Sequence, residues 1–288
     1  MKNVVCIDLG GTKALAARVD GVNLSAPIRR AVPYQGEKEQ INAFVLELVR
    51  STIDEHSQGI AIGVPSMVEM QSGRVLETVN IPSWHNVALQ QLLQTHFELP
   101  VVVHNDANCF AMGEYCYGGH QVQNLVGVCL GTGLGAGIVI DGTLYSGKHA
   151  AAGEFGSFPY RDGIIEHYTS GQFFKRQGLE GGAQALLAQQ GDAHAKALFA
   201  DLGTHIGYAL AQVMLAFDPD KVVLGGSVAR SYSLFAETMG YALSKQAHPI
   251  LVEALQISPG QLEYAPLLGA YALFERHTHL PHKEVYCA

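Results

Sequence analysis

The stretch NVVCIDLGGTKALAARVDG, residues 3–21, decides the fold. Apolar residues on both sides of the glycine pair predict two strands joined by a tight turn. A P-loop needs GxxxxGK[ST] between a strand and a helix, and a Rossmann motif needs GxGxxG at the start of a helix. The stretch has neither pattern. It is therefore predicted to be a β-hairpin, and by itself its tip is equally consistent with an ordinary glycine-rich turn.

A second copy of this hairpin follows 121 positions later, where residues 124–142 read NLVGVCLGTGLGAGIVIDG. The matching positions are Asn3 and Asn124, Val5 and Val126, Leu9-Gly10 and Leu130-Gly131, and Asp20-Gly21 and Asp141-Gly142. Internal similarity of this kind predicts two related halves. Two such tips, each offering backbone N–H groups and a threonine hydroxyl, are suited to holding a polyphosphate between them.

The composition limits the class of protein. A chain of 288 residues with 48% hydrophobic and 15% charged residues has room for two compact domains. The net charge of −8 argues against a nucleic-acid partner, because no surplus of basic residues exists to displace counterions. No apolar run approaches the roughly 20 residues that span a bilayer, and the N-terminus does not read as a secretion signal. Five cysteines without CxxC spacing favour a reduced, cytoplasmic interior.

Helical and apolar segments alternate along the chain, which predicts an α/β protein. Helices are expected over residues 40–56, 86–97 (with Asn86 as N-cap), 106–118, 192–217 and from 227 and 267, and strands over 59–65, 99–106, 221–226 and 251–258. We expect an N-terminal α/β domain over residues 1–115, completed by a C-terminal helix over about 267–288. A C-terminal α/β domain over 116–266 would follow, with hinges near 107–122 and 266.

Asn105 and Asp106 follow an apolar strand, at the position where open α/β sheets usually place their ligands. Asp106 has two interpretations. It either caps the helix that follows or accepts the proton of a substrate hydroxyl that attacks a phosphoryl group. The amide of Asn105, which both donates and accepts, would orient a sugar beside it.

Seven motifs occur in a characteristic order. They are DLGGTK, GVPSMVEMQSG, NDANCFAMGE, CLGTGLGAGIVIDG, GEFGS, IEHYTSG and DPDKVVLGGSVA. In this order they resemble the ROK family of bacterial sugar kinases and related repressors, above all its N-acetylglucosamine kinase, fructokinase and glucokinase branches. The resemblance implies the actin-like ATPase (ribonuclease H-like/hexokinase) fold, with two related α/β domains around a cleft. It also implies ATP-dependent, Mg²⁺-assisted phosphorylation of a hexose or N-acetylhexosamine at O6.

The same resemblance implies a role for each motif. Asp106 is the general base, and the sugar is contacted by Asn80, Asn105, Ser157, Glu154 and Glu166. The phosphates are lined by Gly10, Gly11, Thr12, Gly131, Thr132 and Gly133. Asp8 would hold Mg²⁺ through water, Lys13 is either a phosphate contact or a solvated tip residue, and Gly225 with Gly226 would receive the adenosine.

One segment departs from the family pattern. Ser157 stands where most members have a histidine, and FPYRDGI (158–164) replaces a CxCGxxGC zinc knuckle. Without those cysteines we expect no zinc site. Glu166 must then be positioned by packing alone, with Phe158, Tyr160, Ile164 and Ile165 as candidates. The serine can still offer a hydroxyl to the sugar.

The sequence therefore predicts a cytoplasmic sugar kinase that binds ATP and a small sugar, forms a homodimer, and has no nucleic-acid or membrane partner. The alternative is a non-catalytic, sugar-sensing member of the same family. Family repressors carry an N-terminal helix-turn-helix, and because the phosphate hairpin begins at residue 3 we expect none in this chain. An actin-like filament protein would not explain NDA together with two glutamates suited to holding sugar.

Overall fold

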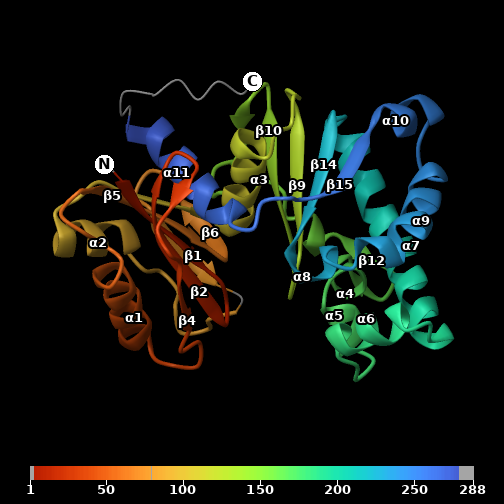
Figure 1. The fold of residues 1–288 in the computed structure, drawn as a ribbon, viewed down its shortest axis with the longest axis horizontal. Coiled ribbons are helices and arrows are strands. Elements are labelled where there is room, and N and C mark those ends of the chain that lie inside the picture. Colours follow the sequence, from red (N-terminus) through yellow and green to blue (C-terminus); the bar gives the residue numbers. More distant parts are fainter. Residues whose placement is uncertain (1–2, 79, 279–288) are drawn as a thin grey trace.

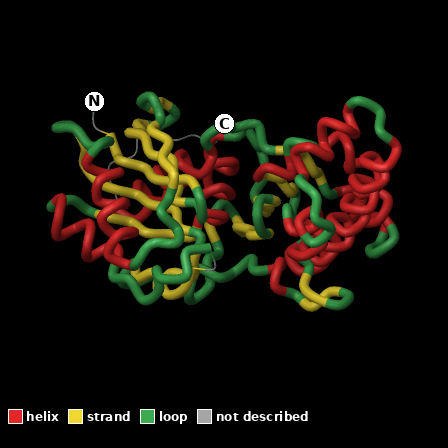
Figure 2. The backbone as a smooth tube through the Cα atoms, turned by 90° about the horizontal axis from the view of Figure 1, so that it is seen from below, coloured by secondary structure: helices red, strands yellow, loops and turns green. Residues whose placement is uncertain are grey.

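The computed structural model describes residues 3–78 and 80–278. Two mixed sheets lie side by side, each with helices on its outer side (Figure 1). Seen from below, the helices of the C-terminal half gather at one end of the molecule (Figure 2). The alternation of strands and helices confirms the α/β class.

The first sheet has six strands in the order β3-β2-β1-β5-β8, with β4 also paired to β2. Their bounds are β1 Asn3–Leu9, β2 Lys13–Asp20, β3 Asn23–Leu24, β4 Ile28–Ala31, β5 Ser57–Val64 and β8 Val101–Asn105. Helices α1 (Lys38–Arg50) and α2 (Leu89–Phe97) belong to this half, as does the separate β6 (Ser66–Glu69) and β7 (Arg74–Thr78) pair. β1 and β2 are antiparallel, which confirms the first predicted hairpin.

The second sheet has five strands in the order β11-β10-β9-β14-β15. Their bounds are β9 Leu125–Leu130, β10 Leu134–Ile140, β11 Thr143–Leu144, β14 Lys221–Gly225 and β15 Gln256–Pro259. The remaining elements of this half are η1 Phe155–Ser157, β12 Pro159–Tyr160, β13 Gly163–Ile164, α4 Glu166–Thr169, α5 Gln172–Lys175, α6 Gly181–Gln189, α7 Ala193–Phe217, α8 Gly226–Ala229, α9 Tyr232–Ser244 and α10 Pro249–Ala254. β9 and β10 form the second predicted hairpin.

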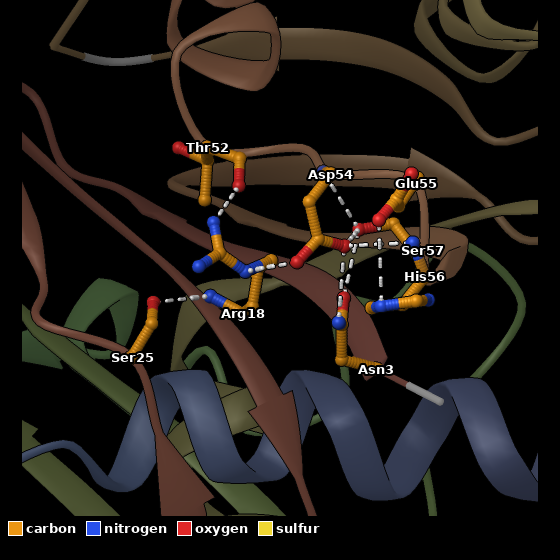
Figure 3. A network of polar contacts seen from close by, with 8 residues as sticks. All are labelled: Asn3, Arg18, Ser25, Thr52, Asp54, Glu55, His56 and Ser57. Atoms are coloured by element: carbon orange, nitrogen blue, oxygen red, sulfur yellow. Dashed lines mark hydrogen bonds and ion pairs between the residues drawn. The ribbon is translucent and has the colours of Figure 1, made fainter. Parts of the chain in front are cut away.

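The repeat extends to the polar side chains at the start of each hairpin. Asn3 donates its side-chain amide to Asp54 Oδ1 (3.2 Å), and Asp54 precedes β5, the parallel neighbour of β1 (Figure 3). In the second half, Asp220 Oδ2 accepts from the backbone N–H of Asn124 (2.8 Å), and Asp220 precedes β14, the parallel neighbour of β9. Each hairpin is thus tied at its base to an aspartate that leads into the next parallel strand.

Two helices, α3 (Asp106–Tyr117) and α11 (Ala265–Thr278), lie between the sheets (Figure 1). They pack against each other, with Ala111 of α3 close to Gly127 of β9 and Phe274 of α11 against Gly59 of β5. α3 is buried on nearly every side, which explains why its sequence has apolar and small residues all round rather than an apolar stripe. Apolar packing therefore joins the two sheets along these helices.

The structure corrects two local predictions. α2 begins at Leu89 with Ala88 as its N-cap, whereas Asn86 has a positive φ of 52° and accepts a hydrogen bond from Arg74. Residues 251–254, predicted as part of a strand over 251–258, instead belong to α10 (Pro249–Ala254), because Pro249 sits in the first turn and His248 accepts the N–H of Ile250 as a cap. Only residues 256–259 of that segment are extended.

The division into domains at residues 115 and 266 stays a prediction. Of the predicted terminal helix over about 267–288, the part up to residue 278 lies within α11, and residues 279–288 lie outside the described part of the chain. Within residues 3–78 and 80–278, no helix combines the length and apolar character needed to cross a membrane.

Candidate active site

Asp106 and Asn105 lie at the junction of β8 and α3. The helix cap is Asn105, whose Oδ1 accepts the backbone N–H of Asn108 at 3.0 Å. Its amide nitrogen donates to the carbonyl of Ser66 at 3.4 Å. Capping is thus done by Asn105, and among the described residues the Asp106 carboxylate accepts only local backbone N–H groups, that of Ala107 at 2.8 Å and its own. The side chain of Asp106 is consequently available for chemistry.

The carboxylate of Asp106 is in an unfavourable place for a negative charge. Burial has the largest effect and raises its pKa. The nearby carboxylate of Asp8 and, to a smaller extent, that of Glu154 raise it as well, to about 7. Burial alone raises the pKa of Asp8 to about 6. Gly63 pairs with Asp8 in the sheet and lies against the backbone of Asp106, which brings the two carboxylates into one neighbourhood. A carboxyl group with a pKa near neutrality is suited to general base catalysis.

Both aspartates line a cavity of about 740 Å³ that lies between the two sheets. Three basic side chains, Lys13, Arg29 and Arg230, also line it. The cavity is closed on the second-sheet side by β14 and α8, where Gly225 is buried against the ring of Phe110 and Gly226 is exposed. Acidic groups and basic groups therefore meet in one hollow, a combination that fits an anionic ligand with an associated cation.

A second cavity of about 480 Å³ adjoins the first, and the two share Ser227 and Arg230. Gly131 and Thr132 of the second hairpin tip line it. The first tip contributes Lys13 to the larger cavity, and its Thr12 is exposed. The two predicted phosphate tips thus open on neighbouring hollows, one from each sheet.

The residues predicted to bind the sugar lie near the two glycine tips and come from both halves of the chain. The side chain of Asn80 packs so closely on Gly11 of the first tip that a Cβ there would collide with it. Glu154 lies at the start of the short helix η1, and partial desolvation together with the nearby Glu166 raises its pKa. Ser157 ends that helix and is exposed. The Gln172 amide and the second tip surround Glu166.

The prediction that packing alone positions Glu166 is wrong, because hydrogen bonds hold its carboxylate. Its Oε2 accepts the backbone N–H of Leu134 at 2.9 Å, and its Oε1 accepts from Gln172. The carboxylate lies directly against Gly133, where any side chain would displace it. A residue predicted only to hold sugar is therefore also part of the second glycine tip.

The chemistry of Asp8 and Asp106 fits a magnesium ion. Among the described residues, neither carboxylate has an ion-pair partner, and both pKa values are raised, so a nearby divalent cation would relieve the buried charge. In the described part of the chain, no group of three or more His, Cys, Asp or Glu side chains is arranged to hold a metal by itself. Magnesium commonly binds through one or two carboxylates, water and substrate phosphates, which suits this arrangement.

Several cavity residues were not predicted from the sequence. Arg29 comes from β4, and Ser227 and Arg230 follow the Gly225-Gly226 pair. In the sequence, Ser227 directly follows that glycine pair, which was the available signal for it, and Arg230 comes three residues later. Nothing in the sequence indicated Arg29, because its place in the cavity depends on the pairing of β4 with β2.

Comparison with known proteins identifies the relatives. The model of the ROK family matches residues 4–277. The N-acetyl-D-glucosamine kinase of Shigella flexneri is 31% identical over 257 residues, 77% of this chain and 83% of the kinase. A xylose repressor of Caldicellulosiruptor bescii is 27% identical over 275 residues, 82% of this chain and 69% of the repressor. The chain spans about two thirds of the length of the xylose repressors that it matches.

A solved structure extends the comparison to the fold. The crystal structure of a ROK family glucokinase from Streptomyces griseus in complex with glucose and AMPPNP superposes with a TM-score of 0.82 at 28% identity. The superposition covers 94% of this chain and 98% of the glucokinase chain. The actin-like ATPase fold implied by the sequence motifs is thereby confirmed.

Proposed function

Because the chain belongs to the ROK family, we propose that it is an ATP-dependent sugar kinase that phosphorylates the O6 hydroxyl of a hexose or N-acetylhexosamine. The observation that carries the proposal is Asp106, a half-buried carboxylate with a pKa raised to about 7 that lines the larger cavity with Lys13 and Gly226. Relatives named glucokinase and N-acetyl-D-glucosamine kinase support the substrate class.

In the proposed reaction, Asp106 accepts the proton of the sugar hydroxyl as its oxygen attacks the γ-phosphorus of ATP. Proton removal of this kind typically contributes on the order of 10²–10⁴-fold to the rate. Asn80, Asn105 and Ser157 hydrogen-bond the sugar, and Glu154 and Glu166 accept bonds from its hydroxyls. Charge-assisted bonds of this type are about twice as strong as neutral ones.

ATP would extend from the larger cavity into the smaller one. The phosphates would lie between the two tips (Gly10, Gly11, Thr12 and Lys13 on one side, Gly131, Thr132 and Gly133 on the other), and the adenosine beside Gly225 and Gly226. A magnesium ion, held through water by Asp8, would neutralise charge on the transferring phosphoryl group. We further propose that the protein is cytoplasmic, that it forms a homodimer, and that it binds no zinc.

The test is a coupled ADP-release assay on purified protein with Mg·ATP and a panel of hexoses and N-acetylhexosamines. Glucose or N-acetylglucosamine is expected to give the highest kcat/KM, and identification of the product as a 6-phosphate checks the position of transfer. ADP release that does not depend on any sugar in the panel would contradict the proposal.

A second candidate, a sugar sensor without kinase activity, is supported by the similarity to the xylose repressor over 82% of this chain. The two candidates differ in turnover. A sensor would bind a sugar with a measurable Kd while releasing no ADP at saturating Mg·ATP.

A further inference from the structure

The segment between Glu154 and Glu166 docks on the long helix α7. Its strands β12 and β13 pair antiparallel over two residues each, too few to hold their shape alone. The hydroxyl of Tyr160, on β12, lies 3.0 Å from Nδ1 of His205, which is 1% exposed in α7. A contact across 45 residues thus fixes the hairpin to the core of the second half.

His205 is arranged to accept this hydrogen bond. Burial lowers its pKa, against the opposing effect of Asp201, while Arg161 lowers it further. The imidazole is therefore neutral at pH 7. Its Nε2 lies 3.5 Å from Asp201 Oδ1, so the ring proton belongs on Nε2 and leaves Nδ1 free to accept from the Tyr160 hydroxyl.

The same group of rings reaches α4, the helix that begins with Glu166. The ring centroids of Tyr160 and Tyr168 are 5.3 Å apart in an edge-to-face arrangement, and those of Tyr168 and His205 are 5.1 Å apart. The guanidinium of Arg161 lies over both tyrosine rings, 5.7 Å and 5.5 Å from their centroids. Tyr168 is two residues beyond Glu166, so the ring cluster holds α4 as well as the hairpin.

α4 and the residues after it bind the second glycine tip through three hydrogen bonds. Glu166 accepts from the N–H of Leu134 (2.9 Å), and the Ser170 hydroxyl is shared between the carbonyl of Thr132 (3.1 Å) and that of Glu166 (2.8 Å). The N–H of Gly171 donates to the carbonyl of Gly131 (2.8 Å). Any shift of α4 therefore moves the tip as well as the Glu166 carboxylate.

We propose that Tyr160 and His205 are positioning residues that set the place of α4, and through it both the sugar-side carboxylate of Glu166 and the phosphate tip at residues 131–134. The substrate side of this inference rests on the proposed kinase function. Neither side chain lines the two cavities described above, so each acts through α4 rather than on a substrate.

The test compares Tyr160→Phe, which loses only the hydroxyl, with Tyr160→Ala, which loses the ring. Tyr241→Phe is the matched control, since Tyr241 is 66% exposed on α9 and far from the site in sequence. Two quantities are measured. The first is backbone hydrogen exchange over residues 131–135 and 158–164 without ligand, and the second is KM for the sugar and for Mg·ATP.

In Tyr160→Phe, exchange at residues 131–135 is expected to speed up by about threefold to tenfold, and both KM values to rise by a similar factor, as for loss of one buried hydrogen bond. The kcat is expected to stay within about twofold of the wild type. Tyr160→Ala is expected to show larger changes in the same direction, and Tyr241→Phe none. If Tyr160→Ala does not fold, the Tyr160→Phe variant alone still tests the positioning role.

Faster exchange confined to residues 158–164, with residues 131–135 unchanged, would overturn the inference. So would a lower Tm with both KM values at the wild-type level, which marks a role in stability alone. The exchange measurement needs no turnover. A wild-type protein that phosphorylates no sugar would therefore refute the proposed function, while the exchange at residues 131–135 would still decide the positioning role.

Discussion

The carboxylate of Glu166 accepts the backbone N–H of Leu134 at 2.9 Å, which joins a sugar-side residue to the second glycine tip. Glu154, the other predicted sugar carboxylate, lies at the start of η1, and among the described residues its carboxylate accepts no backbone N–H. The two glutamates are therefore not equivalent. In the proposed reaction, Glu166 serves both substrate sites and Glu154 serves the sugar side alone.

This difference predicts distinct kinetic effects of two isosteric substitutions. Glu154→Gln is expected to raise the KM for sugar roughly tenfold and leave the KM for Mg·ATP unchanged, because it weakens charge-assisted bonds to hydroxyls. Glu166→Gln is expected to raise both, since a single amide oxygen cannot serve Leu134, Gln172 and the sugar. Steady-state kinetics with each substrate varied in turn distinguishes the two. Equal effects on both KM values in both variants would contradict this assignment.

Asp106→Asn is expected to lower kcat by about 10²–10⁴-fold, because an amide cannot take the proton of the attacking hydroxyl. Sugar binding should remain, since the amide keeps the size and hydrogen-bonding reach of the side chain. Turnover is measured by ADP release and binding by calorimetry. A variant with wild-type kcat would remove Asp106 from the role of base.

The raised pKa of Asp106 predicts an acid limb in the pH dependence of kcat/KM. With its pKa at about 7, the base becomes protonated and inactive as the pH falls below 7, so the rate should drop toward tenfold per pH unit. The Asp8 carboxylate contributes to that raised pKa. In Asp8→Asn the limb should therefore move to lower pH, whatever the absolute rate. A limb that stays in place in this variant would show that another group governs it.

The same burial predicts a stability change that needs no activity. A carboxyl whose pKa rises from 3.8 to about 7 on folding destabilises the protein fully above pH 7, and this cost disappears as the pH falls toward 4. Asp106→Asn should therefore increase the free energy of unfolding at pH 8, on the order of 2 kcal/mol, and by far less at pH 4. Urea unfolding without metal measures both values.

Asp218→Asn is the matched control for that measurement. Asp218 is exposed at the end of α7, in a left-handed conformation that asparagine also adopts readily. It should leave stability nearly unchanged at both pH values. If Asp106→Asn increases the free energy of unfolding equally at pH 4 and pH 8, the ionised carboxylate is not the cause of the increase.

Much of the fold could be read from local sequence. The two hairpins, α7 and the strand leading to Asp106 all appear where residue patterns predict them, because each pattern reports burial along one element. The predictions for Asn86 and for residues 251–254 were wrong. Asn86 has a left-handed backbone and accepts a hydrogen bond from Arg74, 12 residues away, and Pro249 starts a helical turn where the apolar pattern predicts a strand.

The candidate site was predictable only in part. Asp106 could be found because it directly follows a buried strand, and its neighbour Asn105 proved to be the helix cap. The contact of Glu166 with the second glycine tip could not be predicted. Its partner Leu134 lies 32 residues away, and the group that donates is a backbone N–H, which every residue except proline has. The Tyr160–His205 contact was hidden for a similar reason. A histidine within a long helix gives no sign of which loop packs on it.

By itself, the sequence determined the elements that depend on near neighbours, namely the paired strands with glycine turns and the carboxylate at the end of a strand. It also determined the family, through the order of its motifs. Only the tertiary structure decided which groups share one environment. Burial and the proximity of Asp8 set the pKa of Asp106, and contacts between distant segments hold Glu166, because desolvation and charge interactions depend on separation in space rather than along the chain.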